Sequence, residues 1–219
     1  MNAFKHIQEQ LNDYHCKLVA VSKTRTAEDI LKLYDQGQRI FGENRVQELL
    51  VKKDQLPADI SWHLIGHLQS NKVKYVAPFI AMIHSVDSLR LLFEINQEAQ
   101  KNDRIIPVLI QIHIAQEETK FGADEKELIE MLEYYCAENG PLQNVCIKGL
   151  MGMATLTNDV EQIRKEFRHL KNIFSSMKRT MLLHRADFCE LSMGMSSDYA
   201  IALEEGSTLV RIGSLLFSH

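Results

Sequence analysis

The chain is poor in the features that mark secreted, membrane-bound or nucleic-acid-binding proteins. It has only four cysteines, Cys16, Cys136, Cys146 and Cys189, and no Cys-x-x-Cys spacing, which indicates reduced residues packed in or near the core of a cytoplasmic protein. Basic residues form no strong cluster and the formal net charge is −4, so we expect no nucleic acid partner. No apolar run is long enough to span a bilayer, and the N-terminus lacks the apolar centre of a signal peptide.

Linkers and low-complexity segments are also absent from the sequence. The 219 residues, of which 45% are hydrophobic, can bury one sizeable core and match the length of a single large α/β domain. We therefore expect residues 1–219 to form one domain. Since no second domain is expected, we also expect a monomer.

Eight short segments have the composition of β-strands and alternate with segments of helical periodicity. The candidate strands are 17–23, 39–44, 61–66, 82–87, 105–114, 145–154, 187–195 and 208–217. Several are nearly continuous apolar runs, as in 105–110. Such runs are typical of strands covered on both faces, as in a parallel sheet.

The segments between the strands place apolar residues three and four positions apart, as one face of a helix requires. The clearest stripe is Val160, Ile163, Phe167, Leu170, Phe174 and Met177. Eight strands alternating with helices predict an α/β fold, a single closed (β/α)8 barrel of the TIM type, with an extra N-terminal helix at about residues 2–12. An open doubly wound sheet is the alternative, but residues 22–26 lack the Gly-rich turn of a dinucleotide fold.

The first predicted strand leads to a lysine. The apolar run 18–21 is followed by Ser22 and Lys23, and ligands bind at the carboxyl ends of parallel strands. A lysine held there against an apolar wall loses hydration, which favours its neutral amine, and a neutral amine can form a Schiff base with an aldehyde. Taken alone, Lys23 also fits a surface lysine just past a strand. The residues at the other strand ends decide between this interpretation and a Schiff-base lysine.

The ends of the seventh and eighth strands carry the polar residues and glycines that suit a phosphate group. Ser192 and Ser196 flank a glycine, and Ser196 is the candidate N-cap of a helix whose backbone N–H groups converge there. Gly213 and Ser214 add another amide and a hydroxyl. The loops after strands seven and eight are the usual phosphate site of such barrels. A phosphate cradle facing Lys23 suggests one ligand with a phosphate and an aldehyde.

Pyridoxal 5′-phosphate fits that description, and Arg211 is the candidate partner of its ring nitrogen. Arg211 lies on the strand that leads to Gly213. Because arginine stays protonated, it can donate to the pyridine nitrogen and keep that nitrogen unprotonated. An unprotonated ring is a weaker electron sink than a pyridinium paired with a carboxylate. Arg211 therefore favours modest carbanion chemistry or none.

Six longer motifs follow one another along the chain. They are VAVSKT at 19–24, FGENRVQE at 41–48, WHLIGHLQSNK at 62–72, GLMGM at 149–153, LSMGMSSD at 191–198 and GSTLVRIG at 206–213. Together they resemble the pyridoxal phosphate homeostasis protein family, also called the YggS/PROSC family. The resemblance runs from about Val19 to Phe217, and six motifs of this length in one order rarely arise by chance.

The resemblance implies a barrel of the alanine racemase type, the fold type III class of pyridoxal phosphate proteins, with the cofactor bound to Lys23. By position it implies that Asn44 lines the cofactor face and that Arg211 faces the ring nitrogen. It implies that the phosphate is held by Ser192, Ser196, Gly213 and Ser214. Members of the family are thought to buffer and deliver the cofactor without an established turnover, which implies transient contact with apo-enzymes that require it.

The chain departs from the family pattern near the fifth strand. His113 stands where many members have asparagine, and Phe121 replaces the more usual serine. Neither change removes a cofactor contact named above, but the sequence does not determine the shape of the pocket wall near the fifth strand.

Other polar residues near the strand ends have simpler interpretations than catalysis. Glu43 could be a general base, yet a carboxylate at a barrel mouth more often pairs with a nearby lysine or arginine. His63 and His67 straddle a strand end and do not share a helix face, so we expect hydrogen-bonded histidines at the mouth and no metal site. The methionines at 151, 153, 193 and 195 are expected to pack in the barrel interior.

Three functions follow from these residues. The first is a cofactor carrier that holds pyridoxal phosphate as a Schiff base on Lys23, without clear catalytic turnover. The alternative is a pyridoxal-phosphate-dependent amino-acid racemase, which needs a second base facing Lys23 that the sequence does not place. A class I aldolase also uses a Schiff-base lysine, but commonly on a later strand than the first.

Overall fold

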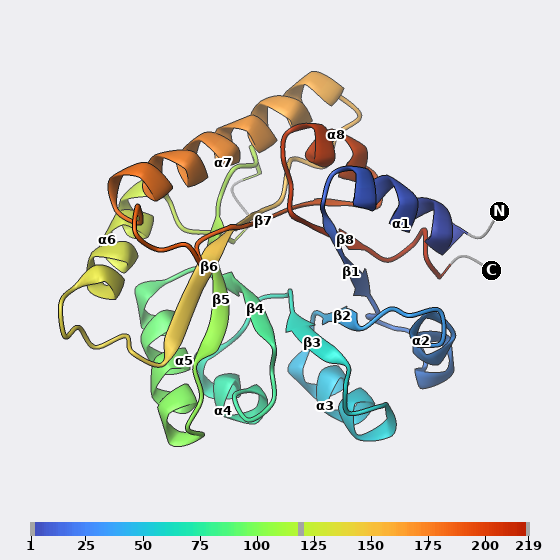
Figure 1. Ribbon diagram of the computed structural model, residues 1–219, viewed down its shortest axis with the longest axis horizontal. Helices are drawn as coiled ribbons and strands as arrows, with labels where there is room; N and C mark the ends of the chain where they lie inside the picture. The colour runs from blue at the N-terminus through green and yellow to red at the C-terminus, as the bar shows by residue number, and fades with distance from the viewer. Residues whose placement is uncertain (1–2, 118–120, 218–219) are drawn as a thin grey trace.

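The computed structural model describes residues 3–117 and 121–217 of the chain. Eight parallel strands pair in the order β1-β2-β3-β4-β5-β6-β7-β8 and close into a barrel, and helices surround the barrel (Figure 1). The closed order confirms the predicted (β/α)8 barrel and excludes the open doubly wound sheet.

The strands and helices alternate as the hydrophobic pattern predicts. The strands are β1 (Lys17–Val21), β2 (Ile40–Glu43), β3 (Ser61–Leu64), β4 (Met82–Val86), β5 (Ile106–Ile112), β6 (Val145–Gly152), β7 (Glu190–Met195) and β8 (Leu209–Ile212). The helices are α1 (Ala3–Asp13), α2 (Ala27–Tyr34), α3 (Val46–Gln55), α4 (Val73–Val76) with the 3-10 turn η1 (Ser70–Lys72) before it, α5 (Leu89–Lys101), α6 (Glu125–Cys136), α7 (Val160–Thr180) and α8 (Tyr199–Glu204). Helix α1 is the predicted N-terminal helix; residue 2 of that prediction lies outside the described residues. All strands except β7 end earlier than predicted, because the final residues of each segment form the loop that follows.

The pairing of β1 with β8 closes the barrel. Val19 lies opposite Arg211 and Ala20 opposite Ile212. Both strands run in the same direction, so their carboxyl ends, and the loops that begin at Ser22 and Gly213, emerge at the same end of the barrel.

Two apolar layers lie on the two sides of the barrel wall. The larger cluster, with Phe41, Leu64 and Phe167 among its members, packs the helices onto the strands. The smaller cluster fills the barrel interior and contains Val19, Leu109, Met151 and Leu209. Because side chains alternate along a strand, Val21 and Arg211, two positions after Val19 and Leu209, point to the same interior, nearer the carboxyl ends.

The four cysteines are divided between the interior and the surface of the protein. All four cysteines are free thiols. Cys16 is buried and Cys146 is half-buried, but Cys136 and Cys189 are exposed. The expectation of core packing is wrong for these two, because one ends α6 and the other precedes β7. No helix within residues 3–117 and 121–217 is long and apolar enough to cross a membrane.

The packing of α7 on the barrel predicts a large stability difference between its two faces. Phe167 is fully buried, so Phe167→Ala leaves a cavity and should lower the free energy of unfolding by about 3–5 kcal/mol. Val160→Ala on the same helix removes a side chain that is 49% exposed and should change it by less than about 0.5 kcal/mol. Urea unfolding followed by circular dichroism measures both; similar losses would contradict this packing.

Candidate functional site

A cavity of about 570 Å³ opens at the carboxyl ends of the strands, within the range of roughly 300–1,000 Å³ that is usual for small-molecule sites. It is lined by Val21, Lys23, Asn44, Ile65, Met153, Met195, Ser196, Ser197, Arg211, Gly213, Ser214 and Leu215. These residues come from the ends of β1, β2, β3, β6, β7 and β8 and from the loops that follow. The barrel therefore gathers side chains from both ends of the sequence at one place.

Nearly all the residues predicted to bind a cofactor line this cavity. They are Lys23, Asn44, Ser196, Arg211, Gly213 and Ser214. Ser192 lies earlier on β7 and has no exposed surface. Arg211 Nη1 donates to Ser192 Oγ at 2.6 Å and to the Ser192 carbonyl oxygen at 2.9 Å. This hydroxyl therefore lies behind Arg211, away from the surface that a phosphate would meet.

Lys23 reaches the cavity through the alternation of side chains along β1. Val19 is in the barrel interior, so Val21 and Lys23 share its face, and both line the cavity. The expectation that an apolar wall strips Lys23 of water is wrong for this structure, because Lys23 is an exposed residue. It lies two residues beyond the end of β1, past the depth at which the barrel wall would cover it.

Arg211 is held rigidly in the floor of the cavity. Besides its bonds to Ser192, its Nη2 donates to the Gly152 carbonyl oxygen at 3.0 Å. Burial lowers the pKa of Arg211 to about 10, against the opposing effect of the Asp198 carboxylate. The guanidinium is therefore still protonated at neutral pH and presents only donors, as the predicted ring-nitrogen partner must.

A chain of buried hydrogen bonds continues from Arg211 through the barrel. Ser192 Oγ lies 3.1 Å from His84 Nδ1, and His84 Nε2 lies 2.9 Å from His63 Nδ1. Because Ser192 Oγ accepts from Arg211, its own hydrogen is available to His84 Nδ1, and His84 then donates from Nε2 to His63. The prediction that His63 is a hydrogen-bonded histidine is confirmed, but its position is inside the barrel and not at the mouth.

The serine loops after β7 and β8 meet directly. The Gly213 backbone N–H donates to Ser196 Oγ at 3.2 Å. The prediction of Ser196 as a helix N-cap is wrong: α8 begins at Tyr199 after Asp198, whose Oδ1 accepts from Met195 N at 2.6 Å and closes a turn over residues 195–198. The hydroxyls therefore belong to a loop and are not engaged in capping α8.

The donor set of the cavity suits an anion. Lys23 and Arg211 supply positive charge, and the hydroxyls of Ser196, Ser197 and Ser214 supply donors. None of the described residues that line the cavity is acidic. Cationic groups together with serine hydroxyls fit a phosphate ester with a ring and a carbonyl group.

Asn44 is placed by a close backbone contact from the next loop. A Cβ added at Gly66 would lie only 2.4 Å from the Asn44 carbonyl oxygen, so only glycine allows the two loops to approach this closely. Ser85 Oγ donates to the Gly66 carbonyl oxygen at 2.6 Å and holds it there. The GENR and IGHL motifs thus support one another at the rim.

The apolar walls of the cavity were not predicted. Ile65, Met153 and Met195 line it. Met151 packs in the barrel interior and Met153 packs against that cluster, as expected, but the expectation is wrong for Met193, which belongs to the larger cluster. The only sign of these lining residues in the sequence was their position at strand ends. An apolar pattern alone does not distinguish a residue that lines a cavity from one that packs in the core.

The two departures near β5 lie away from this cavity. The Phe121 ring stacks on His67 with centroids 4.2 Å apart, and His113 Nε2 lies 2.9 Å from the Glu117 carbonyl oxygen. Neither residue belongs to the described lining.

Comparison with known proteins places the chain in a family. Residues 2–219 match the family described as "Alanine racemase, N-terminal domain", and the barrel aligns with alanine racemase from Bartonella henselae at a TM-score of 0.70 and 19% identity, over 97% of this chain and 58% of that one. The fold and cavity therefore define a barrel of the alanine racemase N-terminal class.

The similarity to smaller relatives is much closer. The pyridoxal phosphate homeostasis protein of Aquifex aeolicus is 42% identical over 92% of this chain and 86% of its own length. PipY of Synechococcus elongatus superposes with a TM-score of 0.91 without pyridoxal phosphate, at 34% identity over 99% of this chain and 98% of that one. Its structure with pyridoxal phosphate bound superposes at 0.88, with the same identity and coverage. The chain belongs to the pyridoxal phosphate homeostasis protein family.

The buried histidines predict an acid-sensitive fold. Burial lowers the pKa of His63 to about 3 and holds that of His84 well below its ordinary value. The unfolded chain gains a proton at each below about pH 6.5, but the folded protein does not. Stability should therefore fall as the pH drops below that value, by about 1.4 kcal/mol per pH unit for each histidine.

His63→Gln should reduce this dependence by about one proton, because the unfolded chain then has one histidine fewer to protonate. The measurement is the urea midpoint between pH 7.5 and pH 5. His67→Gln is the control, since the His67 side chain is 41% exposed; a slope changed equally by both variants would contradict the assignment.

Proposed function

We propose that this protein binds pyridoxal 5′-phosphate in the cavity at the barrel mouth and serves intracellular homeostasis of that cofactor. The observation that carries the proposal is the placement of Lys23, Arg211 and the serine loops around one cavity with no acidic lining residue. The names of the relatives and the cofactor bound in the PipY structure support it.

Each polar residue has a binding role in this proposal. Lys23 Nζ would hold the cofactor through its aldehyde carbon as a Schiff base, and Arg211 would donate to the ring nitrogen. Ser196, Ser214 and the amide groups of their loops bind the phosphate, and Asn44 lines the ring face. When bound, the cofactor supplies an aldehyde that condenses with amines and a ring that can withdraw electrons. Because Arg211 stays protonated, it can only donate to the ring nitrogen. It therefore does not act as the carboxylate partner that keeps this nitrogen protonated and the ring a strong electron sink.

The lining of the cavity also supports a carrier over a racemase. Racemisation requires a second base opposite Lys23. Among the described residues that line the cavity, none has a carboxylate, imidazole, phenol or thiol. We therefore propose that Lys23 retains and releases the cofactor without clear turnover.

The setting of this role is also a proposal. Four free thiols without a disulfide framework fit a reducing compartment, so we propose action in the cytoplasm. Delivery of the cofactor would require transient contact with apo-enzymes that need it. We expect the carrier to act as a monomer.

The covalent role of Lys23 predicts a spectrum. Wild type supplied with pyridoxal phosphate should show an absorption band at about 420 nm, which is usual for an internal pyridoxal imine. Borohydride should remove the band and leave the cofactor attached to the peptide containing Lys23. Lys23→Ala should lack both the band and the adduct.

A colourless wild type at saturating cofactor would contradict the proposal. Alanine racemisation by wild type that is lost in Lys23→Ala would instead favour the racemase. Arg25→Ala is the matched control, because Arg25 follows Lys23 closely but is not among the cavity-lining residues, and its band should persist.

The serine cradle predicts selectivity for the phosphorylated form. Ser196→Ala removes a hydroxyl at the junction of the two loops and should weaken pyridoxal phosphate binding by about tenfold to a hundredfold, the value of a hydrogen bond to a charged group. Binding of pyridoxal, which has no phosphate, should change little. Titration calorimetry with both ligands measures the difference, with Ser175→Ala on the outer helix α7 as control. Equal losses for both ligands would place the phosphate elsewhere.

A further inference from the structure

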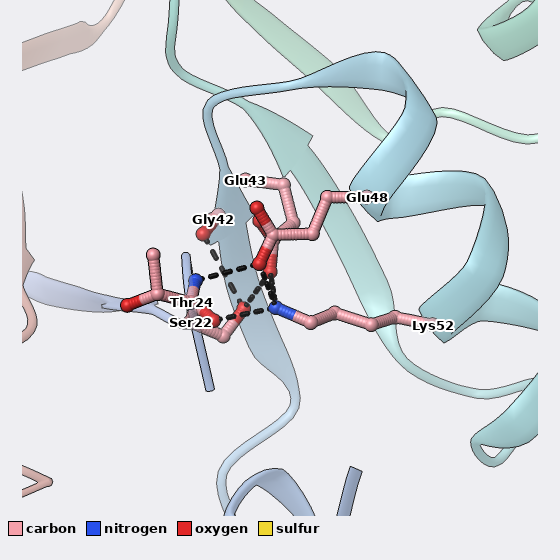
Figure 2. Close-up of polar contacts among 6 residues, drawn as sticks. All are labelled: Ser22, Thr24, Gly42, Glu43, Glu48 and Lys52. Atoms are coloured by element: carbon pink, nitrogen blue, oxygen red, sulfur yellow. Dashed lines mark hydrogen bonds and ion pairs between the residues drawn. The ribbon is translucent and has the colours of Figure 1, made fainter. Parts of the chain in front are cut away.

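Helix α3 holds the two peptide groups that flank Lys23. Lys52 Nζ donates to the Ser22 carbonyl oxygen at 2.6 Å, and Glu48 Oε1 accepts from the Thr24 backbone N–H at 2.6 Å. The first hydrogen bond holds the peptide group before Lys23, and the second holds the peptide group after it. Figure 2 shows both side chains reaching from α3 to the end of β1.

The side chains of Glu48 and Lys52 also form an ion pair with each other. Glu48 and Lys52 are one helical turn apart, and Lys52 Nζ lies 2.6 Å from Glu48 Oε1. Their bonds to the chain around Lys23 are therefore coupled, since each charge fixes the other in place. We call this pair the α3 clamp.

A buried carboxylate anchors the clamp to the barrel. Lys52 Nζ lies 2.7 Å from Glu43 Oε1, and Ser22 Oγ donates to the same oxygen at 2.6 Å. Glu43 is completely buried and the Lys52 side chain is only 7% exposed. The prediction that Glu43 pairs with a nearby cation is confirmed, and its partner comes from α3.

The pKa values of the two carboxyl groups that contact Lys52 are shifted in opposite directions. Burial raises the pKa of Glu43, in spite of its bonds from Lys52 and Ser22. Burial acts in the same direction on Glu48, but its bonds from Lys52 and Thr24 and the Lys52 charge outweigh it, so the pKa of Glu48 is lowered. Glu48 is thus the carboxylate that reliably carries negative charge next to Lys52.

The backbone at Thr24 shows why a clamp is required. Thr24 has φ of 63°, in the left-handed region that a β-branched residue rarely adopts. Such a conformation persists where surrounding contacts enforce it. The Glu48 bond to the Thr24 N–H is a contact of that kind, so the turn that orients Lys23 depends on α3 as well as on the preference of residues 22–24.

We propose that the α3 clamp, Glu48 with Lys52, positions Lys23 for its condensation with the aldehyde of the cofactor, in which Nζ forms a double bond to the aldehyde carbon and the aldehyde oxygen leaves as water. The inference rests on the proposed function of Lys23 and adds two positioning residues that do not line the cavity. Both residues act on Lys23 through the peptide groups on either side of it.

The test compares ligands with and without the aldehyde. Pyridoxal 5′-phosphate can bond to Lys23, whereas 4′-deoxypyridoxine 5′-phosphate retains the ring and phosphate but has no aldehyde. The variants are Glu48→Ala and Lys52→Met, with Lys53→Met as matched control on the same helix. Lys53 is the next residue along α3, and its own ion pair with Asp54 at 3.2 Å is on the surface. Stopped-flow absorbance measures the rate of the covalent step, and calorimetry measures affinity for the analogue.

Loss of the clamp should slow the covalent step by about tenfold to a hundredfold, as expected for a reacting group displaced by about 1 Å. Affinity for the analogue should stay within about twofold of wild type. Glu48→Gln should recover part of the rate, because its side-chain oxygen still accepts from Thr24 N–H. Lys53→Met should match wild type.

Two outcomes would overturn the clamp. One is a rate of the covalent step in Glu48→Ala equal to that of wild type. The other is a fall in affinity for the analogue as large as the fall in the rate of the covalent step. Lys52→Met leaves Glu43 buried without its cation, so if it does not fold, Glu48→Ala decides, since the Glu48 side chain is 25% exposed. Failure of the proposed function is a separate result, because wild type itself would then form no adduct.

Discussion

The hydrogen-bonded seam between β1 and β8 is the constraint on which the site depends. Its register places Val19 opposite Arg211, so the lysine that follows β1 and the loop that follows β8 open into the same cavity. A shift of one residue would turn the side chains of the strand that moved to the other face, so that either Arg211 or Lys23 would point away from the cavity. The seam therefore brings a lysine, an arginine donor and the serine loops to one cavity.

Lys23 and Arg211 are each supported from a different side of the barrel wall. The α3 clamp holds Lys23 from outside, through its flanking peptides. Ser192, His84 and His63 support Arg211 from inside. Both supports are networks of polar groups with buried members, Glu43 and Lys52 in one and Ser192, His84 and His63 in the other, and they specify one geometry because a buried member left unpaired would be costly. The exposed lysine and the buried arginine are thus both oriented before any ligand arrives.

Much of the fold could be predicted from local patterns, because strand composition and helical spacing are properties of short segments. The residues at the cavity followed from one topological rule, that the ends of parallel strands converge. The rest depended on register between distant strands. In the sequence Lys52 is one of two adjacent lysines on α3, and its burial against Glu43 is visible only once α3 packs on β2. Ser192 and Ser196 are equivalent serines in sequence, yet strand depth places one behind Arg211 and the other at the cavity surface.

The seam also links ligand uptake to the order of folding. β1 and β8 are almost the whole chain apart in sequence, and contacts at such separation form late because they close the largest loop. During synthesis Lys23 emerges long before Gly213, so a partly made chain has the lysine without the cradle. A ligand that requires both binds only the closed barrel and stabilises it by mass action. Cofactor supply would then shift the balance between open and closed chains, and the protein's own abundance would follow the ligand that it holds.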